Sequence, residues 1–390
     1  LTAVGFFYLF YSGKKKGIAD KKEIKTRIKD NVPVVILLFG AFLLRAPMLN
    51  TLQKWDAGEY YNSLASACEN YAFTFESFWN NFRLCTHSNL GFSFFMAIGE
   101  FFSPRNSVSV LIVNLILTLL ALYCLYELLY DYWLKCSKGI AAGITFVISC
   151  TPIFLGTFAY VNVDYMLALF AIFVIYAEYK EWHILTIFNA IVLSQVKETG
   201  AIVVAGYFGL KILLRFIQVK GNVFVRIKGC LAKMELWTAV IVGGVYAAGV
   251  IKLGSLSGWV QNTSATSFMS WSSEGINCFG IRPKYILYKL EQFFVMNFAW
   301  ILTAVFLISL VLLLYDFMKG KKGNLDKYIG LVGALAGVVI FGSIYVTYTL
   351  ERYNRFFAVG YTILVSCVSY HAFKERVSMA ITVPCVAVFG

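Results

Sequence analysis

Long apolar runs separated by short polar breaks fill most of this 390-residue chain. A run of about 20 apolar residues is long enough to cross a membrane as a helix. We therefore predict an all-α polytopic bundle of about 11 complete spans, with a partial helix at one or both ends, in a single domain over residues 1–390. Leu1–Tyr11 is too short for a span and is interpreted as the tail of a helix. The predicted spans cover 32–48, 107–130, 139–159, 164–179, 184–197, 201–218, 236–253, 292–316, 328–349 and 356–373, and a final one starts at 377.

Two long polar segments interrupt this pattern, 49–106 and 254–291, and both are rich in aromatic residues and in Ser or Asn. In the first, apolar residues spaced three and four apart predict a helix over Ala57–Ala72 that lies in the membrane interface. A second short amphipathic helix is expected over Ser88–Phe102. The two segments are expected to cover a site at the membrane surface jointly.

Composition and charge fix the class of protein and its orientation. With 59% hydrophobic residues and only 14% charged ones, the chain cannot be one soluble globule. Lys14–Asp30 is the densest basic run, and alternating the spans places 23 of the 34 Lys and Arg residues on its side. Because cations favour the cytoplasmic side, both long polar segments are predicted to be exoplasmic, most simply at the plasma (cytoplasmic) membrane. A nucleic-acid-binding protein would show a basic face on a soluble domain, and the sequence indicates no such face.

The nine cysteines show no C-x-x-C spacing of a zinc site. Most fall within predicted spans, where cysteine behaves as a small apolar residue. Cys68 and Cys85 lie in the first polar segment, where a bridge between them and two free thiols are both open alternatives.

Several ionisable residues fall at the outer ends of predicted spans, where a charge usually has a partner or a task. Asp56 is the best candidate for a general base, with the N-cap of the following helix as the alternative role. Glu59 lies beside it, and Asp164 begins a later span, where it or Asn162 would serve equally as a helix cap. Lys197 and Arg352 are suited to a lipid phosphate. Lys197 could instead pair with Glu198, and Arg352 could anchor a helix end.

These residues occur in segments that resemble a known family. WDAGEYYNSLA resembles the first-loop signature W-D-x-G-x-Y-x-x-x-A of GT-C-type membrane glycosyltransferases. This class includes mannosyltransferases that use dolichyl- or polyprenyl-phosphate sugars and the lipid A aminoarabinose transferases. Further segments in the same order are similar to motifs of its protein-mannosyltransferase-like branch: HSNLGFSFFMAIGEFF, NVDYMLALFAIFVIYA, VKETG and ERYNRFF. The adjacent Asp-Glu pair of that branch is replaced here by Asp-Ala-Gly-Glu.

The resemblance implies an inverting transfer of a hexosyl or pentosyl group from a polyprenyl-phosphate-sugar donor to a glycan, lipid or protein acceptor. It makes Asp56 the catalytic residue, with Glu59 and Asp164 as further carboxylates. His87, Lys197 and Arg352 become candidates for binding the donor phosphate. Carboxylates at an interface can also bind Mg²⁺ or Mn²⁺, so a divalent metal stays an open alternative. Membrane lipids are the other expected partners.

Two other functions remain open from the sequence. A polymerase of lipid-linked glycan repeats would share these substrates, and it would need a large late exoplasmic loop. A lipid or solute transporter would place paired charges near the membrane midplane on broken helices. In this sequence the charges gather at predicted outer helix ends, which favours the transferase.

Overall fold

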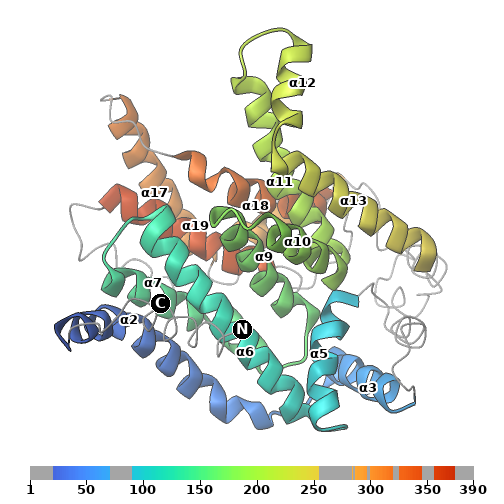
Figure 1. Ribbon diagram of the computed structural model, residues 1–390. Helices are drawn as coiled ribbons and strands as arrows, with labels where there is room; N and C mark the ends of the chain where they lie inside the picture. Colours follow the sequence, from blue (N-terminus) through green and yellow to red (C-terminus); the bar gives the residue numbers. More distant parts are fainter. Residues whose placement is uncertain are drawn as a thin grey trace.

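The chain forms a bundle of helices (Figure 1). The computed structural model describes residues 21–70, 90–253, 283, 286–296, 299–318, 325–344 and 355–373, apart from the side chains of 21–30 and of some residues within helices, Asp56 among them. All regular elements in these ranges are helical, which confirms the all-α prediction. They are α2 (Lys21–Arg45), η1 (Ala46–Asn50), α3 (Trp55–Asn70), α5 (Leu90–Phe102), α6 (Ser107–Glu127), η3 (Leu128–Trp133), α7 (Lys138–Ser149), α8 (Pro152–Phe158), α9 (Val163–Tyr179), α10 (His183–Val196), α11 (Glu198–Gln218), α12 (Val223–Leu231), α13 (Met234–Leu253), α16 (Ile286–Phe294), α17 (Ala299–Met318), η6 (Leu325–Tyr328), α18 (Ile329–Ile344) and α19 (Arg355–Phe373).

The predicted count of about 11 spans is not confirmed. Within the described residues, four helices are long and apolar enough to cross a membrane: Asn31–Asn50, Ser107–Trp133, Thr199–Gln218 and Phe356–Phe373. The number rises to six if two bent pairs each count as one span, α7 with α8 at 66° and α12 with α13 at 74°. The predicted spans 164–179 and 184–197 form helices of 17 and 14 residues, shorter than the roughly 20 that a span needs.

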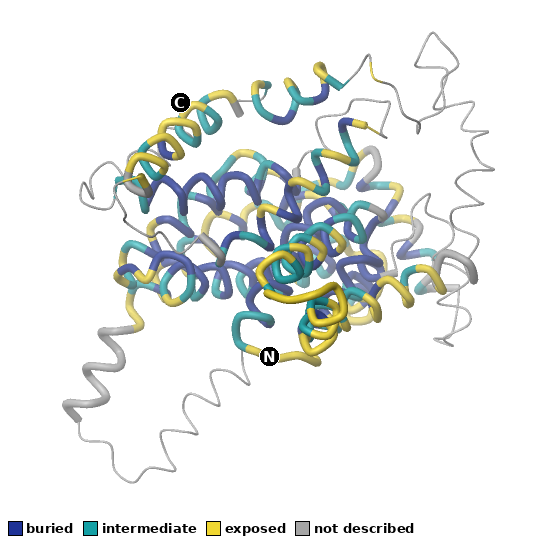
Figure 2. The backbone as a smooth tube through the Cα atoms, turned by 90° about the horizontal axis from the view of Figure 1, so that it is seen from above, coloured by how far each residue is buried: buried dark blue, intermediate teal, exposed yellow. Residues whose placement is uncertain are grey.

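The core of the bundle is built around α9. Nearly all of its residues are buried, and it contacts α6, α8, α10 and α19. In Figure 2 the buried backbone gathers in the centre of the molecule, whereas exposed segments lie outside it. A helix that is apolar on all sides packs stably only in such an environment.

The outer surface of the bundle is strongly apolar. On α2, Val35, Ile36 and Phe39 are exposed, and on α17 Leu307, Ile308 and Val311 are exposed. Contiguous exposed apolar side chains on helices of this length are the mark of a lipid-facing surface. The chain is therefore an integral membrane protein.

Helices α11 and α18 approach each other very closely where a glycine of one faces a glycine of the other. A Cβ on Gly206 of α11 would lie 2.3 Å from the carbonyl oxygen of Gly333 in α18, and the reverse distance is 2.2 Å. Small residues at helix crossings allow such close backbone approach in membrane bundles. Packing of α18 onto α11 therefore depends on the absence of side chains at these two positions.

Candidate active site

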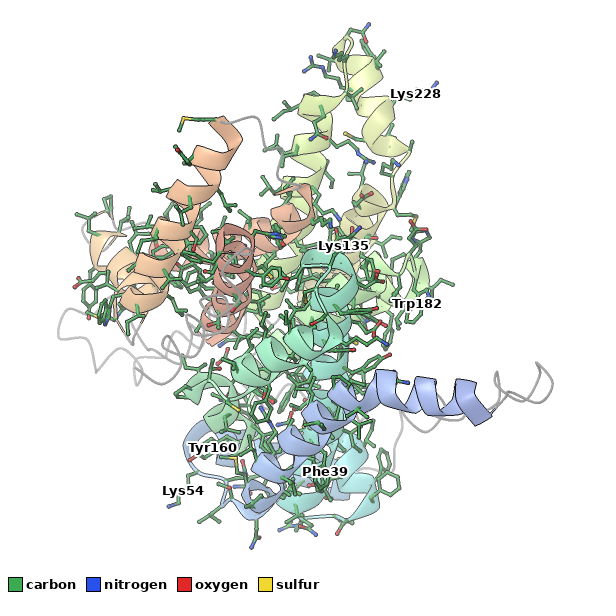
Figure 3. All side chains as sticks on the ribbon, turned by 90° about the vertical axis from the view of Figure 1, so that its left-hand side faces the viewer. Phe39, Lys54, Lys135, Tyr160, Trp182 and Lys228 are labelled. Atoms are coloured by element: carbon green, nitrogen blue, oxygen red, sulfur yellow. The ribbon has the colours of Figure 1, made fainter. Side chains whose placement is uncertain are left out.

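One glutamine side chain joins the two segments that carry Asp56 and Asp164. Gln53 lies between η1 and α3, and its Nε2 donates to the carbonyl oxygens of Thr51 at 2.9 Å and Ala159 at 3.1 Å. Its Oε1 accepts the backbone N–H of Val161 at 2.8 Å. α3 begins two residues after Gln53 and α9 two residues after Val161, so these hydrogen bonds hold together the segments that lead into the two helices. Figure 3 shows the neighbouring residues Lys54 and Tyr160 together at one end of the bundle.

The carboxylate of Asp164 is fixed at the start of α9. Asn162 caps the helix, since its Oδ1 accepts the backbone N–H of Asp164 at 2.7 Å. Of the two capping residues that the sequence allowed, Asn162 is therefore the one used. Asp164 itself is 5% exposed, and its Oδ1 accepts a hydrogen bond from the Lys197 ammonium at 2.8 Å. Its charge also complements the positive end of the helix dipole.

Lys197 reaches this position from a tight turn between α10 and α11. The residue is extended (φ −165°, ψ 159°), and it is 4% exposed. Gly200 follows in the first turn of α11, where a Cβ would lie only 1.9 Å from the carbonyl oxygen of Leu193. The glycine of VKETG therefore permits the close approach of α10 and α11 that directs Lys197 toward Asp164.

Asp56 is the second residue of α3, and its side chain lies outside the description. Since α3 begins at Trp55, Asp56 stands within its first turn, where the helix dipole stabilises a carboxylate. Asp56 therefore does not occupy the N-cap position that was expected for a helix starting at Ala57. One turn later, Glu59 is exposed. Tyr60 packs edge-on against Phe92 of α5 with ring centroids 6.0 Å apart, which holds α3 on the bundle.

The remaining predicted site residues cannot be placed in the same way. His87 and Arg352 lie outside the described residues, as do Cys85 and residues 254–282 of the second polar segment. Cys68 is a free cysteine in α3. Burial, with a smaller effect from Glu100, raises the pKa of its thiol to about 11.

Sequence reasoning overlooked Arg45, the last residue of α2. Its side chain is fully buried, and its guanidinium donates to the carbonyl oxygen of Ser149 at 2.8 Å. The guanidinium carbon also lies 5.6 Å and 5.7 Å from the ring centroids of Phe154 and Phe158, a cation–π geometry. Arg45 thereby fixes the end of α7 where the chain bends into α8. The signal was present as a lone cation at the end of the first apolar run.

A second overlooked cation is Lys289 of α16, which is 4% exposed. Burial lowers the pKa of its ammonium to about 8. α16 packs on the start of α19, where the rings of Phe293 and Phe357 lie 4.9 Å apart. In the sequence Lys289 stands in the polar part of a short helix, and nothing there distinguishes it from an exposed lysine.

Within the described residues, no three His, Cys, Asp or Glu side chains gather as a metal site. One oxygen of Asp164 is already engaged by Lys197. The described residues alone therefore do not form a site for Mg²⁺ or Mn²⁺, and such a metal stays a prediction.

Comparison with known proteins places this geometry in a known fold. No protein-family model and no curated protein sequence matches the chain. Among solved structures, it is similar to the archaeal oligosaccharyltransferase AglB from Archaeoglobus fulgidus in complex with an inhibitory peptide and a dolichol-phosphate, with a TM-score of 0.53 and 13% identity. The chain shares its fold with an oligosaccharyltransferase. The match covers 93% of this chain and 55% of that one, so the chain spans about half the length of AglB.

A second structure of an Archaeoglobus fulgidus oligosaccharyltransferase, in complex with Zn and sulfate, matches with a TM-score of 0.48 and 15% identity over 92% of this chain and 51% of that one. The similarity to AglB confirms, at the level of fold, the resemblance to GT-C-type membrane glycosyltransferases.

Proposed function

We propose that this chain is an inverting membrane glycosyltransferase that moves a sugar from a polyprenyl-phosphate donor to an acceptor at the exoplasmic face, within a single GT-C-like domain. One observation carries the proposal: the Gln53 side chain joins the segments that lead into α3 and α9, and each of these helices carries an aspartate in its first turn. The fold shared with AglB supports the same class of reaction.

Asp56 acts as the general base in this scheme. Its carboxylate takes the proton of an acceptor hydroxyl, and the acceptor oxygen attacks the anomeric carbon from the side opposite the phosphate. The bond between that carbon and the phosphate oxygen breaks, and polyprenyl phosphate leaves with the electron pair. The anomeric configuration is thereby inverted, and only one base is required.

Negative charge grows on the phosphate as the bond breaks, and fixed cations lower the barrier by stabilising it. His87, Lys197 and Arg352 are proposed for this task. Lys197 is held by Asp164 at 2.8 Å, but an ammonium has three N–H donors, so this bond does not by itself exclude a phosphate oxygen. Asp164 is the carboxylate that positions Lys197.

The finer details of the substrates stay predictions. A lipid-phosphate donor is supported by the dolichol-phosphate bound to AglB, and the peptide in that complex makes a peptide one acceptor to test beside glycans and lipids. The transferred group is proposed to be a hexosyl or pentosyl group.

The test compares purified wild-type protein with the Asp56→Asn variant, using a panel of radiolabelled polyprenyl-phosphate sugars and measuring released polyprenyl phosphate. An amide cannot take the proton at neutral pH, so turnover should fall by roughly 100-fold or more. Donor affinity should stay near wild type, because it depends on the cations. The Glu59→Gln variant is the matched comparison, since it removes an exposed carboxylate one turn later in the same helix.

Turnover close to wild type in a stably folded Asp56→Asn protein would remove the proposed base. If Glu59→Gln alone abolished turnover, the role of base would pass to Glu59. Silence of the wild type with every donor would instead favour transport, which the bends of 66° between α7 and α8 and of 74° between α12 and α13 would support.

A further inference from the structure

A cavity lies at the opposite end of the bundle from Asp164. It has a volume of about 510 Å³, within the range of small-molecule sites. Its walls come from the end of α9, the start of α10, the second half of α11 and the start of α13. Glu178 of its wall follows Asp164 by 14 residues in α9, which is roughly 20 Å along a helix. The cavity is therefore separate from the candidate active site.

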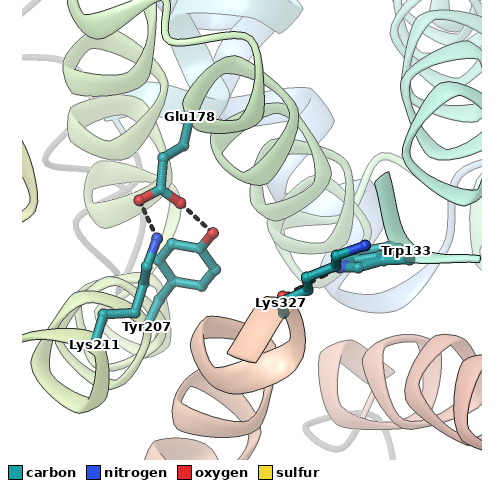
Figure 4. Close-up of polar contacts among 5 residues, drawn as sticks. All are labelled: Trp133, Glu178, Tyr207, Lys211 and Lys327. Atoms are coloured by element: carbon teal, nitrogen blue, oxygen red, sulfur yellow. Dashed lines mark hydrogen bonds and ion pairs between the residues drawn. The ribbon is translucent and has the colours of Figure 1, made fainter. Parts of the chain in front are cut away.

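The inner wall carries a preformed polar cluster. The two carboxylate oxygens of Glu178 accept hydrogen bonds from the Tyr207 hydroxyl and the Lys211 ammonium (Figure 4). The Lys211 Nζ also lies 5.2 Å from the centroid of the Tyr207 ring. These contacts hold all three side chains in place without a ligand, and the charges of Glu178 and Lys211 offset each other.

The mouth of the cavity carries charges of both signs. Glu181, His183 and Lys233 are exposed, and Glu235 is half-buried in the first turn of α13. Among the interactions of the described residues, these four side chains make no ion pair with one another. Counting the inner wall, three glutamates and two lysines line the cavity. The carboxylates would repel a simple anion, and the ammonium groups would repel a simple cation. A zwitterion carries both charges and can pair with groups of either sign.

Apolar surface leads away from the mouth along two helices. Ile184 on α10 is 87% exposed, and Phe188 follows on the same helix at 46%. Trp237 on α13 is 47% exposed, and Trp182, just before α10, is 51% exposed. Tryptophan favours the membrane–water interface, and aliphatic side chains favour the acyl region beside it. A ligand with a polar head in the cavity can therefore extend lipid chains over this surface.

We propose that this cavity binds the headgroup of a zwitterionic aminophospholipid. The ammonium group of the lipid lies against Glu235, and its phosphate lies toward Lys233 and His183. The acyl chains run along the exposed faces of α10 and α13. In the proposed orientation of the protein, this lipid belongs to the cytoplasmic leaflet.

The experiment measures lipid retention by native mass spectrometry of the purified full chain. The protein is exchanged into equal mixtures of phosphatidylethanolamine, phosphatidylcholine and phosphatidylglycerol. We expect phosphatidylethanolamine to be retained at least 10-fold over phosphatidylglycerol, because the anionic lipid brings no ammonium group to Glu235. Phosphatidylcholine should be intermediate, since its quaternary ammonium cannot donate hydrogen bonds to Glu235.

Variants locate the binding site. Glu235→Gln and Lys233→Gln should each reduce retention of phosphatidylethanolamine about 10-fold, since each removes one charge-assisted contact. Lys228→Gln is the matched control, because Lys228 is exposed on the neighbouring α12 and does not line the cavity. Soluble glycerophosphoethanolamine added in excess should compete poorly if the acyl chains contribute, and fully if the headgroup alone binds.

Three results would overturn the proposal. These are preferential retention of phosphatidylglycerol by the wild type, equal losses for Lys228→Gln and Lys233→Gln, and unchanged retention in two folded cavity variants. Full competition by the soluble headgroup would overturn only the path of the acyl chains. Glycosyl transfer is not measured in this experiment, so its outcome is independent of the proposed function.

Discussion

At the scale of single residues, the most informative feature is the buried ion pair between Asp164 and Lys197. Both side chains are almost fully enclosed, at 7% and 5% exposure, and their charged atoms lie 2.8 Å apart. Removing charges from water costs several kcal/mol for each ion, so such a pair is weak evidence for stability. Its value lies in geometry, because it fixes the turn between α10 and α11 against the start of α9.

We expect Asp164→Asn and Lys197→Met each to lower the free energy of unfolding by about 3–5 kcal/mol, because each leaves a buried charge without its carboxylate or ammonium partner. The double variant should regain most of this loss. Thermal unfolding and turnover, measured on the same preparations, test this. A stable double variant without activity would assign the pair a role in the reaction.

Lys180→Gln serves as the control, since its contact with Glu127 is longer, at 3.6 Å, and about a quarter exposed. Its effect should stay below about 1 kcal/mol. Additive losses in the double variant would mean that the two side chains are not coupled.

At the scale of helices, a bend between two helices and a close contact between two others shape the bundle around the candidate active site. Arg45 closes the end of α7 where the chain bends by 66° into α8, and α8 leads directly to the segment held by Gln53. On the other side of the core, α11 and α18 meet through glycines. These contacts depend on backbone geometry, so small substitutions should have large effects.

Gly206→Ala should destabilise the protein by about 1–3 kcal/mol, because the new Cβ would lie 2.3 Å from the Gly333 carbonyl oxygen and force α11 and α18 apart. Gly209→Ala is the matched control on the same helix, since a Cβ there meets nothing within 4 Å. It should be neutral or stabilise by up to about 1 kcal/mol through helix propensity. Unfolding measurements in detergent on both variants decide this. Equal stability of the two would show that the α11–α18 contact is looser than described.

At the scale of the whole molecule, the two ends of the bundle differ in chemistry. The Asp164 end carries the segments that Gln53 joins ahead of α3 and α9, and the Glu178 end carries the polar cavity with its tyrosines. There Lys180 pairs with Glu127 and lies 4.7 Å from the centroid of the Tyr179 ring. Tyrosine favours both membrane interfaces, whereas an excess of lysine favours the cytoplasmic one, as the proposed orientation requires.

Lys54 and Lys228 are both exposed and lie at opposite ends of the bundle (Figure 3). In the proposed orientation, Lys54→Cys should be labelled by a membrane-impermeant maleimide in intact cells. Lys228→Cys should be labelled only after permeabilisation. Peptide mapping separates these positions from the native cysteines. The reverse labelling pattern would place the candidate active site on the cytoplasmic side.

The sequence by itself determined where the helices lie and what kind of solvent surrounds them, because both follow from local periodicity and total apolar content. The helix predicted over Ala57–Ala72 became α3 (Trp55–Asn70), and the span predicted over 356–373 became α19 (Arg355–Phe373). Charge asymmetry among loops also suggested an orientation. Each of these inferences needs only neighbouring residues or sums over segments.

Only the tertiary structure decided which of those elements meet. Nothing in the spacing of Gln53 and Val161, 108 residues apart, indicates that they share a hydrogen bond. Sequence reasoning gave Lys197 a neighbour in Glu198 as its alternative partner, whereas the buried pair is formed with Asp164 of another helix. Such contacts depend on how helices cross, which is set by the packing of distant side chains and by the space that glycines leave. For the same reason the sequence did not reveal the bend between α7 and α8, since a break within an apolar run depends on the partners that satisfy its backbone, as Arg45 does for Ser149.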